Sequence, residues 1–342
     1  PIFRLRLRSF VVGATRAGRA VARVRTRARL AVALFPFAFV AVLLALWASA
    51  EAATPELIDP DYHVRLRVVR AAQHQHPDRP LGLMIGSSRA VWAFRPEQLG
   101  DGEGVLWVNG AHTGAGPTLN RLLVHRYLRD GVRPAVLVIE LMPTFFVKEN
   151  TQFVTGHFAL ADLSLVRGYS DKPFGYEYRL LLHRVRCAPA LARGDDPLAR
   201  SDALHPRGGH TTVYGDVTPA ERARRTALAQ KENEPHLRHM TVRPAADRAF
   251  RDTLREAADH GARVVLLRAP EGPTFRHWYD PAGLARFDAY IEGVAREYGA
   301  PVLDARLWLD EEDFHDSHHA IQRGADKFTA RFAREMVAIL AR

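Results

Sequence analysis

Two short segments, far apart in the sequence, carry residues whose types and spacing suit nucleophilic catalysis. Ser88 lies in Gly86–Arg89, a turn that directly follows an apolar stretch, so its hydroxyl is exposed where a strand passes into a helix. Much later in the chain, Asp316 precedes His319 by three residues. An acid at this spacing can hold an imidazole in the tautomer that removes a proton from a serine. The pattern predicts Ser88 as nucleophile, His319 as base and Asp316 as the group that orients it.

Each segment also has a simpler interpretation when it is taken alone. A serine after a strand is often only a helix cap, and a polar loop often carries surface histidines. The second segment also contains His315 and His318 and is rich in aspartate, which would suit a metal site. No matching group of ligands stands out elsewhere in the sequence. We therefore expect no metal and no cofactor.

The elements that must position these residues alternate between apolar strands and amphipathic helices. The expected strands are 81–85, 105–108, 135–141, 263–267 and 301–303. The expected helical segments are 89–99, 117–129, 245–260, 281–298 and 321–340. This alternation predicts a three-layer α/β/α fold with a central parallel sheet of about five strands. In such folds ligands bind beyond the carboxyl ends of the strands, where both segments would lie.

The remaining stretches of the chain lack this alternation. Residues 51–80 read as a juxtamembrane connector with a short helix at 62–73. Residues 146–244 read as an insertion within an 81–342 domain, helical at 219–231, with Thr218 as the cap.

The order of the motifs resembles that of the SGNH (GDSL-like) hydrolase family over roughly residues 80–340. Gly86–Arg89 matches the family's first block, 108–114 (VNGAHTG) looks like its second, and Asp316–His319 looks like its last, Asp-x-x-His. The resemblance implies a flavodoxin-like sheet and a Ser88–His319–Asp316 triad. It also implies an oxyanion hole formed by the N–H groups of Ser88 and Gly114.

The third block departs from the family pattern. The family usually has Gly-x-Asn-Asp after the third strand, whereas this chain has Glu140 followed by Leu-Met-Pro-Thr, without asparagine. Thr144 is a candidate replacement donor. Arg89 and Trp278 are candidate substrate-binding residues, the first through an anionic group and the second by stacking on a sugar. The alternatives are that Arg89 ties the turn to a carboxylate, that Glu140 is a structural hydrogen-bond partner and that Trp278 packs in the core.

The charge distribution argues against a nucleic-acid partner. The net charge is +10, but residues 1–29 contain nine arginines and no acid, so the rest of the chain is nearly neutral. Cys187 is the only cysteine, which excludes an intrachain disulfide and a multi-cysteine zinc site.

Residues 30–50 form a run of 21 residues without a charged side chain. That length matches the hydrocarbon thickness of a bilayer, and the arginines before it predict a cytoplasmic tail at 1–29. The run is therefore expected to be a transmembrane signal anchor that leaves the following domain extracytoplasmic. A buried core helix and a signal peptide cleaved after Ala48-Ser49-Ala50 are the alternatives.

Together, these features predict an extracytoplasmic serine esterase or O-acyltransferase acting on acyl esters. The branch of the family with a membrane anchor and a long insertion resembles proteins associated with O-acylation of cell-envelope polysaccharides. A catalytically impaired module that binds polysaccharide or scaffolds an envelope complex is the main alternative, and a metal-dependent hydrolase is another. The sequence names no protein partner.

Overall fold

The computed structural model describes residues 2–99, 104–172, 174–180, 207–208 and 215–341. The chain forms two compact units, residues 1–55 and 56–342, and each is described by itself.

The first unit consists mainly of one long helix, α1 (Ile2–Ala53), which contains Pro36. Within its segment Arg25–Ala53, the most apolar 18-residue window has a mean hydropathy of 2.6 and none of it is buried. The segment is long and apolar enough to cross a membrane, and it includes the predicted 30–50 run. A signal sequence would pass the same test, so the choice of an uncleaved anchor stays a prediction.

The second unit is built on a parallel sheet of five strands in the order β2-β1-β3-β4-β5. The strands are β1 (Leu81–Ile85), β2 (Leu106–Asn109), β3 (Val136–Glu140), β4 (Arg263–Arg268) and β5 (Val302–Asp304). This order is that of flavodoxin-like folds, whose strand order reverses between β1 and β3 and opens a crevice at that point. The predicted fold class, a parallel sheet of about five strands between helices, is confirmed.

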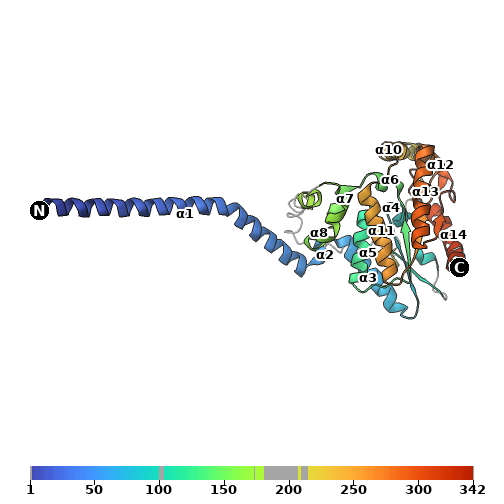
Figure 1. Ribbon diagram of the computed structural model, residues 1–342. Helices are drawn as coiled ribbons and strands as arrows, with labels where there is room; N and C mark the ends of the chain where they lie inside the picture. The colour runs from blue at the N-terminus through green and yellow to red at the C-terminus, as the bar shows by residue number, and fades with distance from the viewer. Residues whose placement is uncertain (1, 100–103, 173, 181–206, 209–214, 342) are drawn as a thin grey trace. The chain divides into compact units, whose positions relative to one another are not determined.

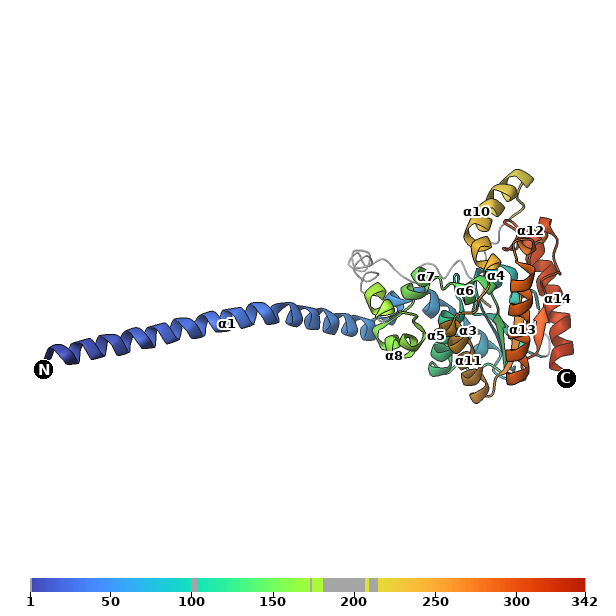
Figure 2. The same ribbon diagram turned by 45° about the horizontal axis from the view of Figure 1, so that its top comes forward.

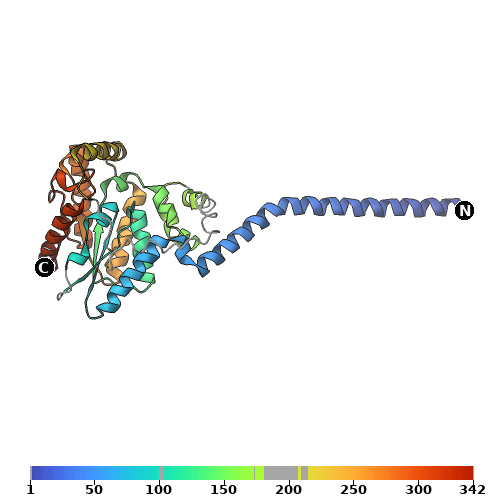
Figure 3. The same cartoon turned by 180° about the vertical axis from the view of Figure 1, so that it is seen from behind.

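Helices cover both faces of this sheet (Figures 1 and 3). The longer ones are α3 (Pro60–Gln75), α5 (Pro117–Arg129), α10 (Pro219–Arg238), α11 (Pro244–Asp259), α13 (Pro281–Tyr298) and α14 (Gln322–Leu340). The short ones are α2 (Pro55–Ile58), α4 (Ser88–Ala93), α6 (Pro143–Val147), α7 (Thr151–Gly156), α8 (Leu163–Val166) and α12 (Pro273–Arg276). Single 3₁₀ turns are η1 (Pro96–Leu99), η2 (Leu160–Asp162), η3 (Arg167–Tyr169) and η5 (Glu311–Asp313).

The alternation of side chains along the strands divides the core into two layers. Leu83 and Ile85 pack with α3, α5, α11 and α13, whereas Met84 packs on the other face with α4 and α14. All five residues of β1 are buried, as expected for a central strand covered on both sides.

The segment expected to be a connector contributes to the core. Helix α3 buries Tyr62, Leu66 and Val69 against α5 because these residues recur at helical spacing along one face. Asp59 caps α3 and also forms a buried ion pair with Arg126 (2.7 Å). The second half of 51–80 therefore belongs to the globular unit, contrary to the expected boundary at residue 81.

The region between β3 and β4 is helical where the structure describes it. Thr218 caps α10 as predicted, since its hydroxyl accepts the N–H of Glu221 (3.2 Å), although α10 extends to Arg238 rather than ending near residue 231. Helix α10 lies beside α12 (Figure 2), and Leu237 O accepts the N–H of Asp280. Part of the predicted insertion, residues 181–206 and 209–214, lies outside the described residues.

Candidate active site

Ser88 is the first residue of α4, at the carboxyl end of β1. Gly86 precedes it with a φ of +154°, and a Cβ there would lie 2.4 Å from the Cβ of Glu140, so the turn requires glycine. Ser87 caps the helix by accepting the N–H of Arg89 (3.2 Å). The Gly-Ser-Ser motif thus assigns its serines different tasks: Ser87 shapes the turn and leaves the side chain of Ser88 partly exposed.

The two segments singled out from the sequence meet at this edge of the sheet. Ser88 Oγ lies 2.7 Å from His319 Nε2, and His319 Nδ1 lies 2.7 Å from Asp316 Oδ2. With a proton on Nδ1, the ring donates to the carboxylate and its Nε2 accepts from the serine hydroxyl, which is the arrangement that activates an alcohol. Ser88 and His319 are partly exposed and Asp316 is buried, so an incoming ester can reach the nucleophile.

The loop that carries Asp316 and His319 is tightly held. Ser317, between them, has a φ of +70°, which is unusual for a residue with a side chain. Its hydroxyl accepts the N–H of Phe275 (2.9 Å) and donates to Glu311 (3.1 Å), while its carbonyl accepts the N–H of Gly272 (2.8 Å). These bonds maintain the strained backbone that directs the neighbouring side chains toward Ser88.

Helix α10 also supports this loop. Arg222 donates to the carbonyl of Phe314 (2.8 Å), directly before the histidine-rich stretch. On the other side of that stretch, a Cβ at Gly324 would lie 2.3 Å from Asp313 O. The glycine therefore allows α14 to start directly against the loop.

Burial changes the protonation of the residues around His319. Burial lowers the pKa of His318 to about 3 and that of His315 to about 4, so both rings are neutral near pH 7. Burial alone would raise the pKa of Asp316, but its interactions with the adjacent His318 and His319 rings, including the hydrogen bond from His319, lower it below its usual value. Asp316 also accepts the N–H groups of His319 (2.8 Å) and His318 (3.2 Å) and stays anionic as an orienting group should.

The second block lies against the nucleophile turn. His112 N–H donates to Gly86 O (2.9 Å), which joins the loop of Gly114 to the turn of Ser88. Gly114 has a φ of +72°, a conformation that favours glycine. The N–H groups of Ser88 and Gly114 donate to no acceptor in the described part of the chain. Both are therefore available to an oxyanion, and their role there stays a prediction.

Arg89 does not face the substrate side. Its guanidinium is 2% exposed, forms ion pairs with Glu140 (3.2 Å) and Glu271 (3.1 Å) and donates to Ala269 O (2.9 Å). Glu140 in turn accepts the N–H of Ser87 (2.8 Å). The substrate-binding interpretation of Arg89 does not match this structure. Arg89 instead ties the turn to carboxylates, which was the alternative for this residue, and Glu140 is the structural hydrogen-bond partner that the sequence favoured.

Trp278 and Thr144 are both buried. Trp278 is 3% exposed and packs on Phe275, with ring centroids 4.8 Å apart, so it forms no wall for a sugar. Thr144 lies at the start of α6, shortly after β3, and its buried hydroxyl has no hydrogen-bond partner among the described residues. Its role as an oxyanion donor therefore stays a prediction.

Three supporting residues had no signal in the sequence strong enough to single them out. Ser317 sits inside the Asp-x-x-His motif, but its positive φ has no local signature. Glu271 reaches Arg89 across 182 positions of the chain. Asn109 donates to Ala90 O (3.0 Å) and Phe94 O (2.9 Å), so it ties the second block to α4. Its position at the start of that block was the one available hint.

The triad coincides with a group of potential metal ligands. His315, Asp316 and His319 each offer one ligand atom, and these atoms lie within 4.8 Å of one another. All three residues already have partners: Asp316 and His319 hydrogen-bond to each other, His319 also contacts Ser88, and His315 Nδ1 lies 3.2 Å from Asp316 Oδ2. A metal would have to displace the proton between Asp316 and His319, so the hydrogen-bonded triad describes these contacts better.

No family model and no curated protein match the sequence. Among solved structures, the chain is similar to TesA (12% identity, 73% of this chain and 94% of that chain, TM-score 0.36). It is also similar to the psychrotrophic esterase EstA from Pseudoalteromonas sp. (9% identity, 77% of this chain and 99% of that chain, TM-score 0.37). A third similar structure is that of Axe2, an acetylxylan esterase from Geobacillus stearothermophilus (13% identity, 75% of this chain and 93% of that chain, TM-score 0.34). At these identities and TM-scores the likeness carries no argument about activity, which therefore depends on the site itself.

Proposed function

We propose that this chain is a serine-dependent enzyme that hydrolyses acyl esters or transfers their acyl group to another hydroxyl through Ser88, His319 and Asp316. The observation that carries the proposal is the continuous pair of short contacts, each 2.7 Å, from the Ser88 hydroxyl through the imidazole to the Asp316 carboxylate. Nucleophile, base and orienting acid within hydrogen-bond reach of one another are the signature of this chemistry.

The reaction proceeds in two halves. As Ser88 Oγ attacks the ester carbonyl, His319 Nε2 takes its proton, and Asp316 stabilises the imidazolium that forms. The tetrahedral intermediate collapses when His319 returns the proton to the departing alcohol, which leaves an acyl group on Ser88. A water molecule or an acceptor hydroxyl then gives its proton to His319 and attacks the acyl-serine. His319 returns that proton to Ser88 Oγ as the bond to the acyl group breaks, which releases the carboxylic acid or a new ester and restores the free enzyme.

The N–H groups of Ser88 and Gly114 stabilise the oxyanion in this scheme. The asparagine expected after the third strand is absent, and Glu140 at that position is occupied by Arg89 and the Ser87 N–H. Loss of one oxyanion donor costs about 10²–10³ in rate. We therefore propose a slower enzyme than one with three donors, unless Thr144 replaces the missing donor.

The finer assignments come from the sequence. The SGNH resemblance supports an ester on a cell-envelope polysaccharide and leaves both hydrolase and O-acyltransferase as outcomes. The arginine-rich tail supports a cytoplasmic N-terminus and an extracytoplasmic second unit. Protease treatment of intact cells tests this orientation: the second unit should be digested while the tail is protected, and the reverse pattern contradicts it.

Hydrolysis of p-nitrophenyl acetate by the purified full chain in detergent tests the activity. Ser88→Ala should remove activity, and Ser164→Ala, which changes an exposed serine elsewhere, should not. Equal activity in Ser88→Ala contradicts the proposal.

The group His315, Asp316 and His319 supports one rival, a metal-dependent hydrolase. A chelator would abolish activity in that case, and stoichiometric zinc would be found in the purified protein. The serine mechanism predicts that activity survives the chelator.

The missing third-block asparagine supports a second rival, a catalytically impaired module that binds polysaccharide or scaffolds an envelope complex. This rival predicts no turnover on p-nitrophenyl acetate or on acetylated polysaccharides, and normal cell function for Ser88→Ala. Loss of cell function in that variant would favour the enzyme.

A further inference from the structure

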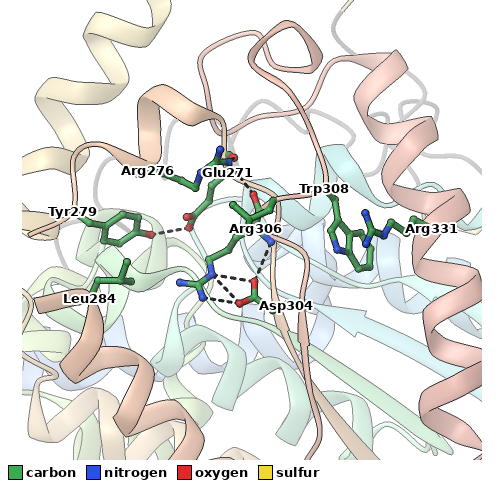
Figure 4. Close-up of a pocket in the computed structure, with 9 residues that line it drawn as sticks. Glu271, Arg276, Tyr279, Leu284, Asp304, Arg306, Trp308 and Arg331 are labelled. Atoms are coloured by element: carbon green, nitrogen blue, oxygen red, sulfur yellow. Dashed lines mark hydrogen bonds and ion pairs between the residues drawn. The ribbon is translucent and has the colours of Figure 1, made fainter. Parts of the chain in front are cut away.

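A separate cavity of about 520 Å³ opens at the carboxyl ends of β4 and β5. Figure 4 shows it between the loop after β4, which carries Glu271, Arg276 and Tyr279, and the segment after β5, with Arg331 on the far side. None of the triad residues lines it. The cavity is large enough for a ligand the size of one or two sugar rings and lies on the edge of the sheet where such folds bind ligands.

Each of the two carboxylates in its wall already has an arginine partner. Glu271 accepts the hydroxyl of Tyr279 (2.7 Å) and pairs with Arg89. Asp304 forms an ion pair with Arg306 (2.6 Å). Three arginines line the cavity against these two acids. Arg276 has no acid within ion-pair distance in the described part of the chain, and Arg331 has only an exposed one, Glu335, at 3.7 Å. The lining therefore has an excess of positive charge.

The first of these two arginines is held by main-chain groups. Arg276 donates to the carbonyls of Glu271 and Arg306. It has no carboxylate within ion-pair distance in the described part of the chain. Carbonyl oxygens fix the position of a guanidinium without cancelling its charge, so this side chain stays ordered and cationic.

The second arginine is held by an aromatic ring. Arg331 lies over the indole of Trp308, 4.5 Å from the ring centroid. Its nearest acid is Glu335 at 3.7 Å, and both of these side chains are more than 40% exposed, so this pair contributes little. A guanidinium pre-positioned by cation–π contact loses less conformational entropy when it binds an anion.

From these contacts we infer that the cavity is a binding site for a small ligand carrying an oxyanion, either a carboxylate or a phosphate, on a sugar-sized body. The guanidinium fork matches the two oxygens of such a group. Leu284 and Tyr279 supply an apolar wall for the rest of the ligand. The inference does not depend on the proposed ester chemistry.

Calorimetric titration of the purified full chain in detergent tests the inference. The probes are galacturonic acid, inorganic phosphate and uncharged galactose. The wild type should show saturable binding of galacturonic acid or phosphate, weakened by added salt, and no binding of galactose. Binding of only one anion supports the site and identifies which oxyanion it prefers.

Arg331→Gln should weaken anion binding about tenfold or more, as expected for loss of a charge-assisted contact. Arg334→Gln is the matched control, because it removes an exposed arginine of the same helix that does not line the cavity. The inference is overturned if neither anion binds, if galactose binds as well as galacturonic acid, or if the two variants bind alike. Labelling of Ser88 by a fluorophosphonate in Arg331→Gln, measured separately, keeps a failure here distinct from a failure of the triad.

Discussion

Two of the arginines that the second unit buries, Arg89 and Arg126, have similar surroundings but lie at different places. Arg89 is fully buried between Glu140 and Glu271, directly after Ser88. Arg126 is buried between Asp59 (2.7 Å) and Asp162, on α5. Each guanidinium thus faces two acids, and each donates to a main-chain carbonyl as well.

The Arg89 cluster (with Glu140 and Glu271) and the Arg126 cluster (with Asp59 and Asp162) connect different parts of the unit. In the Arg89 cluster, Glu140 accepts the N–H of Ser87 (2.8 Å), so its bonds end on the nucleophile turn. The Arg126 cluster joins α3, α5 and the segment after α7, where His157 contacts Asp59 (2.8 Å). The same buried chemistry therefore serves two purposes: one cluster fixes the geometry of the reactive site, and the other fastens α3 to the domain.

The largest effect is expected from Arg89→Met. Removing this cation leaves two buried acids unpaired, which costs about 3–5 kcal/mol of unfolding free energy. The turn that presents Ser88 also loses its brace, so fluorophosphonate labelling of the folded fraction should slow by about 10²-fold. Urea unfolding and labelling rates of the full chain in detergent measure the two effects. Normal labelling of the folded fraction would remove the distinction between the clusters.

Arg126→Met should destabilise the domain to a similar extent, by about 3–5 kcal/mol, because Asp59 and Asp162 lose their partner. Labelling of Ser88 per folded molecule should be unchanged, since none of the ion pairs and hydrogen bonds that Arg126 forms with described residues reaches the turn of Ser88. The same two measurements apply. A loss of labelling that matches Arg89→Met would show that the Arg126 cluster also sets the geometry of the site.

Much of this architecture could be predicted from local sequence. The bounds of β1, α5 and α13 match the expected ranges because an apolar run or a proline at the first turn marks each boundary. The meeting of Ser88 with His319 followed from the order of motifs along a parallel sheet. These features depend on spacing that is visible within a few residues or on a rule of topology.

The clusters themselves could not be predicted. Glu271 and Arg89 are separated by 182 positions, and Asp59 and Arg126 by 67. Nothing local to either residue indicates its partner. For the same reason the sequence left both a substrate-binding and a structural role open for Arg89, and it predicted that residues 51–80 lie outside the domain. The burial of an arginine or of a short helix depends on the elements that cover it.

The smallest expected effect is a change of unfolding free energy with pH. Near neutral pH we expect it from the Arg126 cluster and not from the Arg89 cluster. Burial alone would lower the pKa of His157, but the Asp59 charge and hydrogen bond raise it above its usual value. The protonated ring therefore adds stability that is fully present below about pH 6.5, its usual pKa, and is lost as pH rises through the folded-state value. The Arg89 cluster contains no histidine among its ion-pair partners.

Unfolding of the wild type and of His157→Gln across pH 6–9 checks this prediction. The wild type should lose more stability than the variant as pH rises. Parallel curves would mean that His157 binds no extra proton in the folded state.

The central claim is that Ser88 is the nucleophile activated by His319 and Asp316. Treatment of the full chain with a fluorophosphonate, followed by peptide mass spectrometry, tests it most directly. The account predicts one adduct, on the peptide containing Ser88, that is absent in Ser88→Ala and forms about 10⁴-fold more slowly in Asp316→Asn. An adduct on another residue, or undiminished labelling of Ser88→Ala, would contradict it.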